Sequence, residues 1–192
     1  MAAPAPPTRW TAAMVRALPD DRKRYEVIDG GLLVTPSPTG LHQRAVSRLI
    51  VLLDPYVNAC GLGTVLASPA DIELDREGYV QPDVFVTGLL GGREAVAWNS
   101  GAPYLLFVEV LSPSTARSDR IIKRRRFQRA GIPEYWIIDL DARSIERWRP
   151  SDERPEILTE AIAWQPDPRH PPLTIELPAY FAKVHAEARP AP

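Results

Sequence analysis

The sequence predicts an α/β fold in which helices flank a mixed β-sheet, with a hairpin near the N-terminus. Residues 105–111 are apolar on both faces of an extended segment, which is typical of a central strand covered on two sides. Residues 112–115 can cap a helix that runs to about residue 130, and a second apolar strand follows at 135–139. This order predicts two parallel neighbours joined by a crossover. Apolar residues over 41–57 also recur at helical spacing.

The other elements follow from local signals. Two β-rich runs, 25–28 and 32–35, flank a glycine-containing turn and predict the N-terminal hairpin. The further expected elements are a short helix over 11–18, an extended segment over 65–74 that is irregular at Pro69, a strand over 79–86, a hairpin strand over 144–148, a final strand pair through Ile157 and 173–177, and a short helix over 180–184.

Length and composition favour one domain. The 192 residues are 45% hydrophobic, enough for one full core, so we expect a single domain over 1–192 with a core of about 20–185 and flexible termini at 2–7 and 186–192. The formal net charge of -1 shows no overall basicity that would indicate nucleic-acid binding. A positive surface would have to be local, and residues 117–129 are its obvious source, although such a run is equally typical of a solvated helix face.

Several protein classes are disfavoured. Cys60 is the sole cysteine, which excludes an intramolecular disulfide and a cysteine-cluster metal site. No stretch approaches the roughly 20 apolar residues of a membrane span. The first residues also lack a basic region followed by an apolar one. We therefore expect a cytoplasmic protein that does not bind membranes.

Two carboxylates stand where apolar residues would be less costly. Glu109 lies inside the apolar strand 105–111, and Asp83 lies in the predicted strand 79–86. If their oxygens came within about 4 Å, they would repel by about 4 kcal/mol at an effective dielectric of 20. A divalent cation removes this penalty, and hard oxygen ligands favour Mg²⁺ or Mn²⁺ over zinc. A proton shared between the two carboxylates would remove it as well.

Two basic side chains are candidates for the same site. Lys123 shares a helical face with Phe127, so it is predicted to point toward the sheet, where it could stabilise negative charge on a phosphate or position a water. An ion pair with Asp119, one turn earlier, is the simpler interpretation and is worth a few tenths of a kcal/mol. His42 lies on the buried side of helix 41–57, where a histidine is often structural.

Four segments carry a family resemblance: residues 81–83 (QPD), 107–115 (FVEVLSPST), 119–123 and 131–136 (GIPEYW). Together they resemble a bacterial family of putative restriction endonucleases within the PD-(D/E)XK nuclease superfamily, over residues 25–148. The resemblance implies a restriction-endonuclease-like core, DNA as substrate, and a divalent metal at Asp83 and Glu109.

One position departs from the superfamily pattern. Leu111 stands two residues after Glu109, where the motif has a lysine. The resemblance suggests that Lys123 has taken over that role from the next helix, and that Glu26 and His42 are also active-site members. By spacing alone, Glu26 would be an exposed strand residue.

The leading hypothesis is therefore a metal-dependent endodeoxyribonuclease. Mg²⁺ or Mn²⁺ would be held by Asp83, Glu109 and the Val110 carbonyl, with Lys123, Glu26 and His42 completing the catalytic set. One alternative is a catalytically inactive module that binds nucleic acid or a partner through the basic segment 120–129. Hydrolysis of a smaller phosphate ester is another. A homodimer is plausible by resemblance alone.

Overall fold

The computed structural model describes residues 9–18, 23–95 and 101–186. The predicted flexible segments 2–7 and 187–192 lie outside these residues. Within them, a six-stranded sheet has the order β10-β9-β8-β7-β6-β3. Its strands are β3 (Gly63–Ala67), β6 (Val84–Gly88), β7 (Tyr104–Val110), β8 (Tyr135–Asp139), β9 (Ser144–Trp148) and β10 (Glu156–Leu158).

The sheet is mixed, as predicted. β7 and β8 run parallel, with Glu109 opposite Ile137, whereas the other neighbouring strands of this sheet are antiparallel. The last five residues of β7 and the first four of β8 are buried. The apolar faces at 105–111 and 135–139 are therefore explained by a central position covered on both sides.

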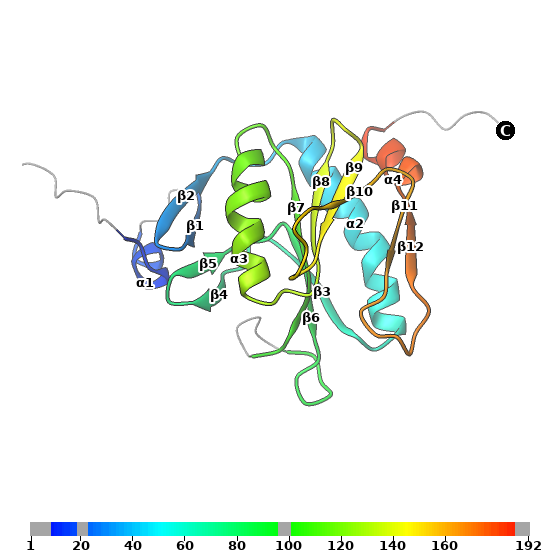
Figure 1. Ribbon diagram of the computed structural model, residues 1–192, viewed down its shortest axis with the longest axis horizontal. Helices are drawn as coiled ribbons and strands as arrows, with labels where there is room; N and C mark the ends of the chain where they lie inside the picture. The colour runs from blue at the N-terminus through cyan, green and yellow to red at the C-terminus, as the bar shows by residue number, and fades with distance from the viewer. Residues whose placement is uncertain (1–8, 19–22, 96–100, 187–192) are drawn as a thin grey trace, which may run out of the picture.

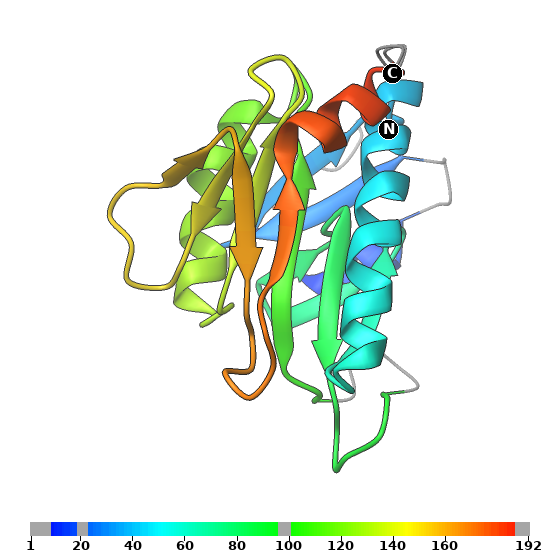
Figure 2. The same cartoon turned by 90° about the vertical axis from the view of Figure 1, so that its right-hand side faces the viewer.

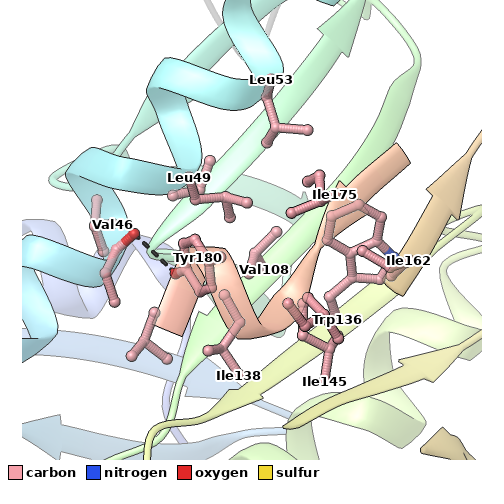
Figure 3. Close-up of a cluster of buried hydrophobic side chains, with 14 of the residues drawn as sticks. Val46, Leu49, Leu53, Val108, Trp136, Ile138, Ile145, Ile162, Ile175 and Tyr180 are labelled. Carbon is pink, nitrogen blue, oxygen red and sulfur yellow. Dashed lines mark hydrogen bonds between the residues drawn. The ribbon is translucent and has the colours of Figure 1, made fainter. Parts of the chain in front are cut away.

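One face of the sheet is covered by α2 (Gly40–Ala59), α4 (Leu177–Val184) and the two-stranded sheet of β11 (Ala161–Trp164) and β12 (Leu173–Glu176). Figure 2 shows α4 crossing the N-terminal end of α2, where the Tyr180 hydroxyl donates to the Ala45 carbonyl at 3.0 Å. Trp136 is fully buried among these elements (Figure 3). This layer fixes the helix that carries His42.

The opposite face is covered by η1 (Ser118–Lys123), a π-helical segment, by α3 (Arg124–Arg129), and by a second sheet (Figure 1). This four-stranded sheet has the order β2-β1-β5-β4. Its strands are β1 (Arg24–Ile28), β2 (Gly31–Thr35), β4 (Ile72–Asp75) and β5 (Gly78–Val80), and α1 (Ala12–Arg16), capped by Thr11, packs on it. The predicted N-terminal hairpin is β1–β2.

The second sheet corrects two predictions. The segment 79–86 is not one strand: β5 ends at Val80, β6 begins at Val84, and the two belong to different sheets. Pro82 lacks the N–H that a continuous strand needs, and the Ser68 hydroxyl donates to its carbonyl at 2.6 Å. The segment 65–74 is likewise divided between β3 and β4. Both breaks move the chain from one sheet to the other.

Two further predictions about boundaries are wrong. The helix after β7 begins at Ser118 rather than at 112–115, where the Ser112 N–H donates to the Thr115 hydroxyl in a separate turn. The predicted final strand pair is also absent, because Ile157 lies in β10 and pairs with β9, whereas β12 pairs with β11. Strand β11 was not predicted.

Gly63 provides a test of how tightly β3 and β6 pack. Its φ is +147°, and a Cβ atom placed there would overlap the Thr87 carbonyl oxygen. We expect Gly63→Ala to lower the free energy of unfolding by about 2–3 kcal/mol in urea titrations. Gly61→Ala is the matched control, because Gly61 also has a positive φ but nothing within 4 Å of such a Cβ. Equal losses in the two variants would contradict this packing.

Candidate active site

Elements of both sheets and two helical segments bring all five predicted residues to one place, at the C-terminal end of β7. His42, Asp83, Glu109 and Lys123 line a cavity of about 530 Å³. The cavity is also lined by Arg24 and by the loops at 35–39 and 111–116. Glu26, on β1, lies against Lys123. Residues separated by almost 100 positions in the chain therefore form one cluster.

Lys123 is the centre of this cluster. Its Nζ lies 2.8 Å from Glu26 Oε2, 2.8 Å from Glu109 Oε1 and 3.5 Å from Asp119 Oδ1. Burial lowers the pKa of Lys123, but the three carboxylates outweigh it and raise the pKa above the usual value. Both interpretations of Lys123, the inward lysine and the pair with Asp119, are present in the structure. Lys123 stays protonated at neutral pH.

Asp83 accepts hydrogen bonds through both of its oxygens. Arg24 Nη1 donates to Oδ1 at 2.7 Å, and the Val110 N–H donates to Oδ2 at 2.8 Å. His42 Nε2 lies 3.0 Å from the same Oδ2. Burial alone would raise the pKa of Asp83, but the contact with His42 and the charge of Arg24 hold it below its usual range. Asp83 is therefore an ionised and oriented carboxylate.

Glu109 has the opposite electrostatic environment. Burial raises its pKa, Lys123 and Arg24 oppose this, and Asp83 and Asp119 add to it, so the pKa lies well above the ordinary value. Four buried carboxylates, Glu26, Asp83, Glu109 and Asp119, face two permanent cations, Arg24 and Lys123. The site has room in its charge balance for a proton or a further cation.

Glu26 is completely buried, so the alternative of an exposed strand residue is wrong. β1 lies in the interior of the small sheet, between β2 and β5. The Gln81 N–H donates to Glu26 Oε1 at 2.9 Å, at the point where the chain leaves β5. The same break that ends β5 therefore fixes Glu26 beside Lys123.

The residues fit a divalent cation in chemistry and in charge. Asp83 and Glu109 lie close together on adjacent parts of the large sheet and supply hard oxygen ligands. Because the N–H and C=O of a strand residue point to the same side, the Val110 carbonyl faces the same neighbour as its N–H, which bonds Asp83. Within the described residues no three Asp, Glu, His or Cys side chains form a ready metal cluster. Arg24, rather than a third acidic ligand, contacts both carboxylates.

Sequence reasoning missed Arg24 as a site residue. It precedes Glu26 by two positions in a strand, so both side chains lie on the same face. That spacing was available from the sequence, but it indicates only a shared face and not what lies opposite. Asp119 was considered only as a partner of Lys123, yet it is buried and contributes to the negative charge.

The basic segment 117–129 is largely paired with acidic residues. Arg120 donates to Asp139 and to Glu146 at 2.8 and 2.6 Å. Arg126 and Arg129 form ion pairs with Asp75 and Asp29, and Arg124 lies over the Trp148 ring. These contacts favour an acid-paired helix face over an open basic surface.

The comparisons with known proteins agree with this geometry. The family model described as "Uma2: Putative restriction endonuclease" matches residues 12–179. The chain belongs to the Uma2 family. Its match includes all five predicted site residues and Arg24. No curated protein matches the chain.

The Uma2 assignment is accompanied by a structural similarity. A crystal structure of a putative nuclease belonging to DUF820 from Anabaena variabilis is 19% identical to this chain, with a TM-score of 0.71. The similarity covers 91% of this chain and 99% of that one. At this identity the similarity supports the fold, a mixed sheet flanked by helices, as the sequence predicted. No helix within the described residues has the length and apolar character that crossing a bilayer requires.

Proposed function

We propose that this Uma2 protein is a metal-dependent endonuclease that hydrolyses phosphodiester bonds in DNA. The observation that carries the proposal is the position of Lys123, whose buried ammonium lies 2.8 Å from both Glu26 and Glu109 beside the oriented carboxylate of Asp83. A buried lysine among acidic residues at the end of a central strand is expensive to maintain for structure alone. Family membership supports DNA as the substrate.

Asp83, Glu109 and the Val110 carbonyl would hold Mg²⁺ or Mn²⁺. When bound, this ion supplies a Lewis acid for the phosphoryl oxygen and lowers the pKa of a water. The raised pKa of Lys123 makes it a donor that stabilises negative charge, rather than a general base. Glu26 holds the Lys123 ammonium from the side away from the cavity. Cleavage of both DNA strands would suit a homodimer with two such sites.

The metal requirement is tested with supercoiled plasmid and single-stranded DNA. We expect the protein to nick plasmid in the presence of Mg²⁺ or Mn²⁺ and to lose this activity in EDTA. Absence of cleavage with either metal would contradict the proposal. Binding of DNA with a steep salt dependence but without cleavage would favour the inactive module, and turnover of a small phosphodiester without any action on DNA would favour the smaller substrate.

His42 is expected to act by positioning Asp83, because its Nε2 contacts Oδ2 at 3.0 Å. Loss of a residue that orients a metal ligand typically costs about 10–100-fold in metal affinity or activity. We expect His42→Gln to lower the nicking rate by about this factor. Gln43→Ala, at the exposed neighbouring position, is the control. Nicking by His42→Gln at the wild-type rate would contradict the positioning role.

A further inference from the structure

Arg24 lies between the two carboxylates that are proposed to hold the metal. Its Nη1 is 2.7 Å from Asp83 Oδ1, and its Nη2 is 3.7 Å from Glu109 Oε2. The second distance is too long for a hydrogen bond. Arg24 thus supplies a positive charge where a divalent cation would be bound by the same two side chains.

The contacts made by Arg24 are incomplete. Nε and Nη2, which form one edge of the guanidinium group, are buried and have no hydrogen-bond partner among the described residues. An unsatisfied buried donor costs about 1–3 kcal/mol. The arrangement therefore stabilises Asp83 and Glu109 at the expense of Arg24 itself. A second position for this side chain would relieve that cost.

The cavity offers such a position. The side chain of Arg24 is 20% exposed and lines the cavity, together with the loops at 35–39 and 111–116. Arginine binds phosphate groups through two parallel N–H donors, a geometry that the edge formed by Nε and Nη2 provides. A phosphate in the cavity would satisfy both donors.

We propose that Arg24 is an exchangeable counterion and a substrate-binding residue. It neutralises Asp83 and Glu109 when the metal is absent, is displaced by the divalent cation, and then binds the DNA phosphate through Nε and Nη2. This inference rests on the proposed metal-dependent function. It differs from that function in assigning competition with the metal, and contact with the substrate, to one side chain.

The competition is measured by titrating Mn²⁺ into the protein in a calorimeter, without DNA. Removal of a competing cation should make the affinity of Arg24→Gln for Mn²⁺ about tenfold or more higher than that of the wild type. Arg48→Gln is the matched control, because Arg48 is exposed on α2 and the substitution removes the same charge. Circular dichroism confirms that each variant is folded.

The two ways of failing are distinguishable. Equal or weaker Mn²⁺ binding by folded Arg24→Gln overturns the competition while leaving the proposed function intact. If neither the wild type nor Arg24→Gln binds Mn²⁺, the metal site itself is refuted, and this inference with it. Mn²⁺ binding by Arg24→Gln alone would support the competition.

The contact with phosphate is measured by the binding of labelled DNA in Ca²⁺, a divalent ion used here to limit cleavage. Arg24→Lys keeps the charge and serves if the neutral variant does not fold. Because lysine lacks the two-donor edge, we expect its DNA affinity to fall about fivefold or more while its Mn²⁺ affinity stays within about threefold of wild type. Unchanged DNA affinity in this variant overturns the phosphate contact.

A crystal structure of the wild type soaked with Mn²⁺ tests the exchange directly. We expect the ion between Asp83 and Glu109, and the 2.7 Å contact from Arg24 Nη1 to Asp83 to be broken. An ion at these carboxylates with Arg24 still in its present position would overturn the displacement.

Discussion

Replacing Lys123 with methionine is expected to lower the free energy of unfolding by about 3–5 kcal/mol, because it removes one partner of a buried ion-pair cluster. Glu26, Glu109 and Asp119 would be left facing one another with no ammonium among them. Methionine has a similar length and fills the space, so the loss reports charge rather than a cavity. Urea titrations followed by circular dichroism measure it.

Lys183→Met is the control, since Lys183 is exposed on α4 and the substitution is chemically the same. The control should change the free energy of unfolding by less than about 0.5 kcal/mol. A loss below about 1 kcal/mol in Lys123→Met would mean that the cluster tolerates the missing charge. Adding Glu109→Gln to Lys123→Met should recover part of the loss, because it removes one of the uncompensated carboxylates.

Glu109→Gln is expected to separate activity from stability. The substitution removes a proposed metal ligand, and we expect the nicking rate to fall by about 10³-fold or more, the loss of several kcal/mol of transition-state stabilisation. The free energy of unfolding should change by only about 1 kcal/mol, because burial already raises the pKa of Glu109 and favours its neutral form, which glutamine resembles.

The rate is measured on supercoiled plasmid with Mn²⁺, and Glu153→Gln, at an exposed position, is the control. The control should nick DNA at the wild-type rate. A folded Glu109→Gln protein whose rate lies within about tenfold of wild type would remove Glu109 from the proposed metal site.

The parts of the fold that were predictable are those in which local pattern and burial agree. The doubly apolar strand became β7, the periodic segment over 41–57 became α2, and the glycine turn joined β1 to β2. The costly position of Glu109 in an apolar strand pointed to a site before any geometry was known. Lys123 was placed on the inner face by its spacing from Phe127, and both are buried.

The parts that were missed depend on contacts between distant segments. Pro82 signalled an irregular strand, but not that the chain would change sheets there. Glu26 could not be recognised as buried from its own strand, because its environment comes from Lys123 and from the Gln81 N–H. Arg24 carried no signal that it would lie between two carboxylates. Tertiary packing, rather than local propensity, decides each of these points.

The division of the site between two sheets has a consequence for how the protein loses activity. Arg24 and Glu26 lie on β1 of the four-stranded sheet, whereas Glu109 lies on β7 of the six-stranded sheet. A slip of one residue in β1 would turn Glu26 away from Lys123. Local opening of the small sheet would therefore disable the site while the large core stays folded, so hydrogen exchange at β1 should set an upper limit on how long the assembled site persists.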